Sequence, residues 1–429
     1  MRFQHRFLAV FAVTLLAATV QAATFNVNST LDEPDAVPGD GNCISTPTGV
    51  CTLRAAIIEA NQNVAVDTIN LPAGIFTLTL AGIAEDVAVT GDLDILTPIN
   101  ILGAGTAATA VNANGIDRVI HVLMGDVDLT LEDLTVRGGS AVTSGSYLGG
   151  GVFHQGRNLS LVRVRITGNV ANAAGGLWVA NGSSASIEQS TIDNNEAENI
   201  GFTNANGPAI INEGALDLSN STVANNTAFT WNVAIIEIPR CSGSGFSATN
   251  STIANNSGSG IGSWNCNVLL RHVTVAGNSG WGLNFGSFDG NSTLDVGNSI
   301  IAGNIAPDCQ IGSGLPTFQY SLDGDGTCGL SALAGDLPAT DPQLLPLDNW
   351  GGPTQTMYPK PWASPVVDAG GAPICQALDQ RSHTRGNDGN GDGAAGCDMG
   401  AVEADNLVFI DGVESGDTGE WSSTVGSAT

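Results

Sequence analysis

Few side chains in this sequence are suited to catalysis. His154, Glu213 and Glu237 are weak candidates for a general acid or base. A glycoside hydrolase requires two carboxyl groups at a defined separation, and a polysaccharide lyase requires a base. Phe153 and Trp178 offer aromatic ring faces on which sugar rings could stack. Whether these residues act together depends on the register of the strands that carry them.

The candidates belong to an apolar row expected on the outer side of successive strands. The row comprises Phe153, Trp178, Ile211 and Ile236, near His154, Glu213 and Glu237. An open row of this kind would form a groove for a glycan. The preferred interpretation is that loops cover the row, or that its register differs from the one assumed.

A second candidate site is a glycine-rich segment near the C-terminal end. Asp388, Asn390 and Asp392 alternate with glycines, as at the start of a calcium-binding loop. The twelfth position would be Met399 rather than glutamate, so a solvated loop is the preferred interpretation. Calcium is the one cofactor that the sequence suggests, and its expected effect is to stabilise the fold rather than to assist catalysis.

A repeated strand pattern must position these residues. An apolar residue followed three positions later by asparagine recurs every 22 to 31 residues, with anchors at Ile166, Ile192, Val223, Ile253, Val275 and Ile301. Spacing of this size marks a repeat architecture. Short β-rich segments separated by glycine and asparagine, without helical periodicity, predict an all-β fold, namely a right-handed parallel β-helix.

Coils of a β-helix lie about 4.8 Å apart, so equivalent residues stack in columns. The anchors should form one interior column, and a second should lie five residues earlier, at Leu161, Ile187, Leu218, Ala248, Leu270 and Val296. The asparagines should form a ladder of hydrogen-bonded amides at a corner, at Asn169, Asn195, Asn226, Asn256, Asn278 and Asn304. Arg163 and His272 share another corner position with amide side chains, and we expect them only to cap the turn.

The residues that flank the anchors should point outward. They are mostly threonine and alanine, with Asp193 as the single carboxylate. This face therefore carries no pair of acids, and no compact nucleophile motif occurs elsewhere. The pattern favours a non-catalytic protein.

The N-terminal block has a distinctive motif, Cys51-Thr-Leu-Arg-Ala-Ala56, within residues 24–61. It resembles the CSLREA domain of bacterial surface and secreted proteins. Thr52 retains the N-cap of a helix, whereas Ala55 replaces the glutamate of a capping box. We expect a short helix that covers the open end of the β-helix, with a structural rather than a catalytic role for Arg54.

Two further segments resemble parts of bacterial surface proteins. The Gly-Gly-x-apolar and apolar-x-x-Asn segments of about residues 120–306 are similar to the repeats of polymorphic outer-membrane proteins. Asn349-Trp-Gly-Gly-Pro-Thr354, Ser364-Pro-Val-Val-Asp-Ala-Gly370 and Cys397-Asp-Met-Gly-Ala-Val-Glu403 resemble the choice-of-anchor Q domain, although Trp350 interrupts the first motif. That resemblance implies surface association and no particular activity.

Charge and export signals limit the partners. Arg2 and Arg6 precede an apolar run that ends in a small-x-small motif, so we expect a signal peptide cleaved after Ala22. No later segment is apolar enough to span a membrane, and a net charge of −28 argues against nucleic acid. Eight cysteines in an exported chain indicate disulfides, and local pairing predicts Cys43–Cys51, Cys241–Cys266, Cys309–Cys328 and Cys375–Cys397.

Together these features predict an all-β chain with an N-terminal helical cap and a C-terminal loop-rich domain. The expected parts are a signal peptide (1–22), a cap with the first coils (23–119), the repeats (120–336), a C-terminal domain (337–403) and an acidic tail (404–429). We expect a bacterial protein that is secreted or lies at the cell surface. It would present an extended face to a surface or glycan ligand. The alternative is a carbohydrate-active enzyme, either a polysaccharide lyase or a glycoside hydrolase.

Overall fold

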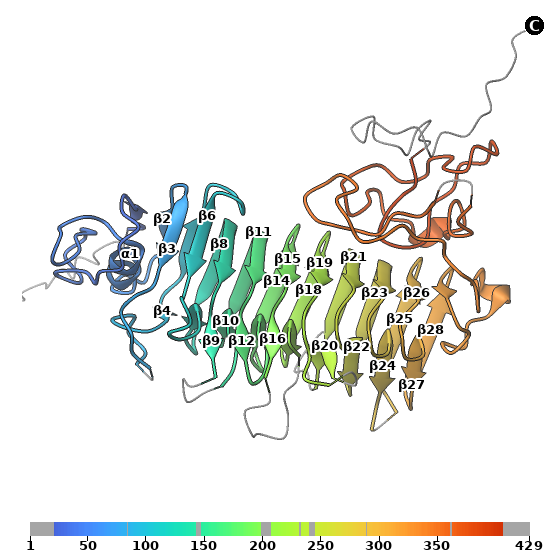
Figure 1. Cartoon of the computed structure of the whole chain (residues 1–429), viewed down its shortest axis with the longest axis horizontal. Coiled ribbons are helices and arrows are strands. Elements are labelled where there is room, and N and C mark those ends of the chain that lie inside the picture. The colour runs from blue at the N-terminus through green and yellow to red at the C-terminus, as the bar shows by residue number, and fades with distance from the viewer. Residues whose placement is uncertain are drawn as a thin grey trace, which may run out of the picture.

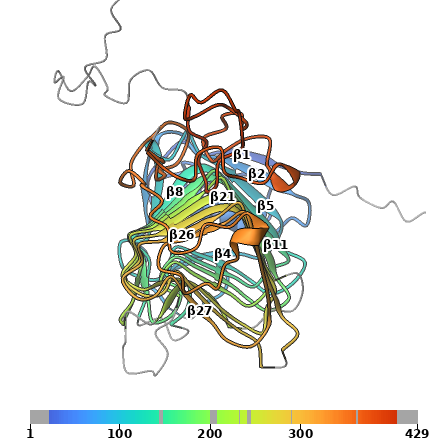
Figure 2. The same ribbon diagram turned by 90° about the vertical axis from the view of Figure 1, so that its right-hand side faces the viewer.

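The protein is described here by a computed structural model that covers residues 21–405, except 84, 143–146, 199–206, 231–232, 240–244, 289 and 361–362. Its strands stack along one axis as a parallel β-solenoid of about 8 turns (Figure 1). Seen along the stack, the coils superimpose (Figure 2). The predicted parallel β-helix is therefore confirmed. No helix in these residues is long and apolar enough to cross a membrane.

Within the described ranges the strands form three parallel sheets. The 17 strands of the large sheet are β1 (Thr24–Asn26), β2 (Asp67–Asn70), β3 (Gly74–Thr77), β5 (Ile99–Leu102), β6 (Thr109–Asn112), β8 (Asp128–Arg137), β11 (Asn158–Thr167), β14 (Ser184–Glu188), β15 (Thr191–Asp193), β18 (Ala215–Ser219), β19 (Thr222–Ala224), β21 (Phe246–Ala254), β23 (Val268–Ala276), β25 (Thr293–Gly297), β26 (Ile300–Ala302), β28 (Leu315–Gln319) and β29 (Leu322–Asp323).

The second sheet, called the narrow sheet below, comprises β4 (Leu93–Ile95), β7 (Ile120–Val122), β10 (Val152–His154), β13 (Leu177–Val179), β17 (Ile210–Asn212), β20 (Ala234–Ile238), β22 (Ser259–Trp264), β24 (Leu283–Gly286) and β27 (Cys309–Ile311). The third comprises β9 (Ser140–Ala141), β12 (Val170–Ala171) and β16 (Glu196–Ala197). One α-helix, α1 (Leu53–Ala60), and two 3₁₀ helices, η1 (Ala332–Ala334) and η2 (Ala372–Ile374), complete the elements of the described residues.

Both predicted interior columns are present. Ile166 pairs in register with Ile192, and the column continues through the predicted anchors to Ile301. The column that begins at Leu161 likewise continues to Val296. These residues are at most 1% exposed, so both columns stabilise the fold by burying their apolar side chains almost completely.

The predicted asparagine ladder is confirmed rung by rung. The side-chain amide of Asn169 donates to Oδ1 of Asn195 at 2.9 Å, and the same bond repeats up to Asn304 at 2.8–3.1 Å. Asp308 accepts the last amide at 2.8 Å and ends the ladder. At the neighbouring corner, Arg163 and His272 have φ values of 52° and 54°. Both adopt the left-handed backbone of a turn, as expected for that position.

The helix α1 covers the N-terminal end of the stack (Figure 1). The hydroxyl of Thr52 accepts a hydrogen bond from the backbone N–H of Ala55, which confirms the predicted N-cap. Arg54 is 1% exposed, forms an ion pair with Asp32 and donates to the carbonyl of Ala88 at 2.9 Å. These contacts support a structural role for Arg54.

Residues 341–404 form a loop-rich segment, the C-terminal segment, which lies against the outer face of the large sheet (Figure 1). The hydroxyl of Thr252 is 2.6 Å from Oε1 of Gln380 and 2.8 Å from the hydroxyl of Thr356. The hydroxyl of Thr274 accepts from the backbone N–H of Ala401 at 3.0 Å. Thr252 and Thr274 therefore bind this segment, and both are buried.

Three of the four predicted disulfides are present: Cys43–Cys51, Cys309–Cys328 and Cys375–Cys397. Cys266 is also disulfide-bonded. Its predicted partner, Cys241, lies outside the described residues, as do most of the predicted signal peptide and the acidic tail after Asp405.

Candidate functional site

The structure separates the weak catalytic candidates. His154 points into the solenoid, where it pairs with Val179 and is fully buried. Burial lowers the pKa of His154 to about 4, so its ring is neutral at pH 7. Glu237 lies in the outward row of the narrow sheet, opposite Ile211. His154 and Glu237 therefore face opposite sides of the sheet and cannot share one site. Glu213 follows the end of β17, and its backbone N–H donates to Val179.

The expected outer row was wrong at one position. Ile236 pairs with Ile210 inside the solenoid, so Glu237 takes the outward place that was predicted for Ile236. A strand alternates its faces at every residue, and a register error of one residue therefore exchanges inside and outside.

Loops cover most of this row. Phe153 and Ile211 are only 7% and 3% exposed. The rings of Phe153 and Trp178 meet edge to face at 6.4 Å, and Trp178 keeps partial exposure. Leu148, Ala173 and Ala174 from the glycine-rich corners complete a small apolar cluster with Ile211 and Trp178. This arrangement agrees with the interpretation of a largely covered row, and sugar binding at Phe153 and Trp178 stays a prediction.

A hollow of about 210 Å³ lies elsewhere, on the outer face of the large sheet (the Arg165 hollow). Most of its lining comes from β8, β11, β15 and their corners, and Pro353 of the C-terminal segment also lines it. The polar lining residues are Thr106, Asp133, Arg163, Arg165, Gln189 and Thr191. The hollow therefore lies at the edge of the area that the C-terminal segment covers, where the outer face of the sheet becomes accessible.

Carboxylates hold the two guanidinium groups of this hollow in place. Nε and Nη2 of Arg165 donate to Asp193 at 2.9 and 2.6 Å. The same two nitrogens of Arg163 donate to Asp133 at 2.8 Å each, and Nη2 also pairs with Glu132. The Asp193 carboxylate raises the pKa of Arg165 above its usual value. The side chains of Arg163 and Arg165 are 38% and 46% exposed, and among the described residues neither Nη1 has a partner.

A second group of polar side chains lies at the start of the narrow sheet (the Asp94–His121 site). Asp94 of β4 and His121 of β7 are register neighbours. Nδ1 of His121 lies 3.2 Å from Oδ1 of Asp94 and 3.7 Å from Oδ1 of Asp86. Nε2 of His121 is 3.1 Å from Oε1 of Gln155, and Phe153 stacks on the imidazole at 5.1 Å.

Further charges surround this site. Burial raises the pKa of Asp94 and of Asp117 to about 6, and the nearby Asp92 carboxylate contributes to both shifts. The guanidinium of Arg118 pairs with Asp92. Burial is the largest single influence and lowers the pKa of His121, but Asp94, Gln155 and Asp92 together outweigh it and the net shift is upward. Charged groups are therefore concentrated here beneath the loop that carries Asp86.

Sequence reasoning missed this site. Asp92-Leu-Asp94-Ile95 alternates polar and apolar residues, and His121 follows the apolar pair Val119-Ile120. Asp94 and His121 lie 27 positions apart and pair in register, a spacing within the range of the later repeats. This spacing could have indicated that the two residues are neighbours in successive coils. The first coils lack the asparagine that identified the later repeats, so the spacing was not recognised.

Two further acidic clusters accept hydrogen bonds from backbone N–H groups. Asp308, Asp323 and Asp325 lie close together beside a cavity of about 400 Å³. All three accept backbone N–H groups, for example Asp308 from Gly324 at 2.9 Å. In the predicted calcium loop, Asp388 accepts from Gly391 at 2.7 Å and from Gly393 at 2.8 Å. Calcium binding at that loop remains a prediction.

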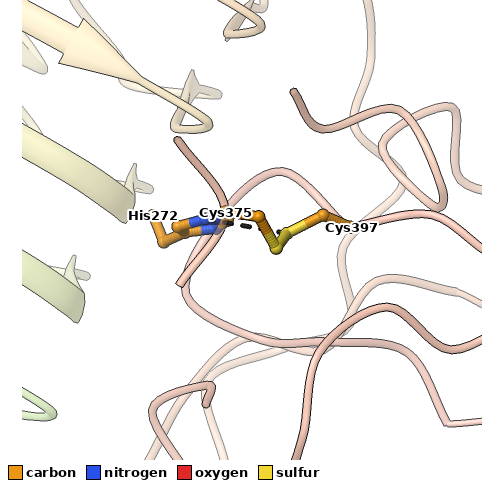
Figure 3. Close-up of side chains that lie close together, drawn as sticks. All are labelled: His272, Cys375 and Cys397. Atoms are coloured by element: carbon orange, nitrogen blue, oxygen red, sulfur yellow. Dashed lines mark hydrogen bonds between the residues drawn. A yellow bond between two sulfur atoms is a disulfide. The ribbon is translucent and has the colours of Figure 1, made fainter. Parts of the chain in front are cut away.

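His272 lies beside two sulfur atoms in Figure 3, but this group is structural. Cys375 and Cys397 are joined as a disulfide, so neither supplies a thiolate. Nε2 of His272 is 3.0 Å from the amide nitrogen of Asn298 and accepts from the backbone N–H of Gln376. Burial and the nearby Arg385 guanidinium lower the pKa of His272 to about 2. The neutral ring therefore attaches the C-terminal segment to the solenoid.

Comparisons with known proteins bear on the fold. The structure is similar to that of pectate lyase Pel9A, at 14% identity and a TM-score of 0.52, over 90% of this chain and 98% of that one. It also matches the A-module of the Azotobacter vinelandii mannuronan C-5 epimerase AlgE6, at 18% identity and a TM-score of 0.42, over 70% and 76% of the two chains. No family model and no curated protein matches the sequence. The likeness to the pectate lyase shows a shared parallel β-helix, and shared fold alone does not define activity.

Proposed function

We propose that this chain is an exported, non-catalytic β-helix protein that binds a neutral glycan in the Arg165 hollow. The observation that carries the proposal is the hollow itself, a concave and partly exposed site lined by guanidinium, amide and hydroxyl groups. Such groups, fixed in position, recognise the hydroxyl groups of a sugar by hydrogen bonds. Its volume of about 210 Å³ suits the end or one residue of a glycan rather than a large enclosed ligand.

The local charge favours a neutral ligand over an acidic one. Two guanidinium groups, of Arg163 and Arg165, face three carboxylates, of Glu132, Asp133 and Asp193. The guanidinium groups are therefore already neutralised, and the chain as a whole has a net charge of −28. A polyuronate would be repelled. The pectate lyase with the same fold acts, by its name, on an acidic polysaccharide, so its substrate is not transferred to this chain.

Binding to a glycan array that contains neutral and acidic bacterial and plant glycans tests the proposal. We expect neutral glycans to bind, and replacement of Arg165 by methionine to weaken the best one by about tenfold, the value of one charge-assisted hydrogen bond. Arg157→Met is the matched control, because Arg157 also pairs with an aspartate, Asp128, but does not line the hollow.

Two results would contradict the proposal. Equal affinity of both arginine variants would remove the hollow as the binding site. Release of reducing ends or of unsaturated products from any bound glycan would establish the alternative, a carbohydrate-active enzyme.

A further inference from the structure

We infer that Asp86, Asp94 and His121 bind a single divalent transition-metal ion. The three side chains come from β4, β7 and the loop before β4, and their nearest ligand atoms all lie within 4.8 Å of one another. The site is separate from the Arg165 hollow, so the inference does not depend on glycan binding.

The distances suit a shared ion. Ligand atoms about 2.1 Å from a tetrahedral metal ion lie about 3.4 Å from one another. Nδ1 of His121 lies 3.2 Å from the Asp94 oxygen and 3.7 Å from the Asp86 oxygen. Small movements of Asp86, whose side chain is 67% exposed, are enough to complete the geometry.

The buried ligand atoms lack any other partner. Asp94 is fully buried and the His121 side chain is only 9% exposed. Among the described residues, Oδ1 of Asp94 and Nδ1 of His121 form no regular hydrogen bond, although only 3.2 Å separates them. Leaving such atoms unsatisfied costs about 1–3 kcal/mol each. A bound cation would satisfy both.

Neighbouring groups orient the two buried ligands and determine which nitrogen of the imidazole carries the proton. Oδ2 of Asp94 accepts from the backbone N–H of Ala88 at 2.8 Å, which leaves Oδ1 directed at the imidazole. Nε2 of His121 lies 3.1 Å from Oε1 of Gln155 and donates to it. In a neutral imidazole this leaves the lone pair on Nδ1 facing Asp94. Such a bond to the second ring nitrogen is the usual support of a metal-binding histidine.

The donor set selects the class of ion. One imidazole nitrogen and two carboxylate oxygens suit Zn²⁺ or Co²⁺, whereas Ca²⁺ prefers six or more oxygen atoms. Asp92 and Asp117 add two carboxylates near the site, against the single guanidinium of Arg118. The surroundings therefore favour a cation.

Co²⁺ titration of the tag-free, chelator-treated mature protein tests the inference, with visible absorption and calorimetry as readouts. We expect one ion per chain, a ligand-field spectrum that depends on His121, and competition by Zn²⁺. His121→Gln should abolish the spectrum. Asp86→Asn should weaken binding by at least about tenfold. Because Asp86 is exposed, its replacement does not endanger folding.

His383→Gln is the matched control, since this exposed histidine also lies near an aspartate, Asp405, at 3.4 Å. It should leave binding unchanged. Asp392→Asn separates any contribution of the predicted calcium loop. The inference fails if the wild-type protein binds no Co²⁺ or Zn²⁺, or if His121→Gln and Asp86→Asn bind as the wild type does.

Discussion

Replacement of Glu237 by glutamine tests whether the outer row of the narrow sheet is sealed from water. Glu237 is 9% exposed and lies in that row between Ile211 and Gly262. A Cβ atom added to Gly262 would lie 3.1 Å from its carboxylate, so the carboxyl fills the space above this glycine. Burial raises the pKa of Glu237 to about 7, and only a backbone N–H opposes the shift.

The sign and size of the effect follow from this shift. The folded chain holds the proton up to about pH 7, whereas the ordinary glutamate loses it near 4.5. Stability from this group is therefore fully present below about pH 4.5 and is lost as the pH rises through about 7. One pKa unit corresponds to about 1.4 kcal/mol, so the loss amounts to about 3 kcal/mol at pH 8.

Glutamine keeps the shape and does not ionise. We expect Glu237→Gln to match the wild type within about 1 kcal/mol at pH 4.5 and to exceed it by about 3 kcal/mol at pH 8. Denaturant unfolding at several pH values, with disulfides intact, measures the difference. Other titrating groups contribute equally to both proteins and cancel in the subtraction. Stability curves of the two proteins that stay parallel from pH 4.5 to 8 would refute the sealed row.

Two further predictions concern stability and processing. Asn226→Ala should destabilise the fold by about 3 kcal/mol, because this fully buried side-chain amide donates hydrogen bonds to Asn256 at 3.1 Å and to the carbonyl of Ile192 at 2.9 Å. Urea unfolding measures the loss, and Asn158→Ala, at an exposed asparagine, is the control. Cleavage after Ala22 would turn the backbone N–H of Ala23, 2.7 Å from Asp67, into an ammonium paired with a buried carboxylate. The intact mass of the mature protein should then give Ala23 as the first residue, and Asp67→Asn should lower the Tm. A different N-terminal residue, or an unchanged Tm, would contradict this pairing.

Features that repeat in the sequence could be predicted, and isolated ones could not. The interior columns and the asparagine ladder follow from six copies of one segment, since each copy fixes the register of its neighbours. The N-cap at Thr52 was predictable because capping depends on a few adjacent residues. These interactions are either local or periodic.

The errors lie where a single copy departs from the repeat. At β20 the alternation places Glu237 outward, one residue away from the assumed position, and no neighbouring motif fixes that register. The threonine face was predicted only to point outward; its docking to residues 341–404 could not be predicted, because it joins segments more than a hundred positions apart, as between Thr252 and Gln380. Alternation within a strand reveals which side a residue faces, but not what covers that side.

The covered face explains where chemistry remains available. Coils from β19 to β26 use their outer threonines and corner residues, such as Asn250 and Asn298, to bind the C-terminal segment. Those coils have little outer surface left on the large sheet. The Arg165 hollow and the Asp94–His121 site both lie before β19, and Pro353 of the C-terminal segment lines the hollow. The scarcity of charge beside the later anchors is therefore a property of a docking surface. It is not evidence that the whole protein lacks a site, and the search for function belongs at the N-terminal half of the stack.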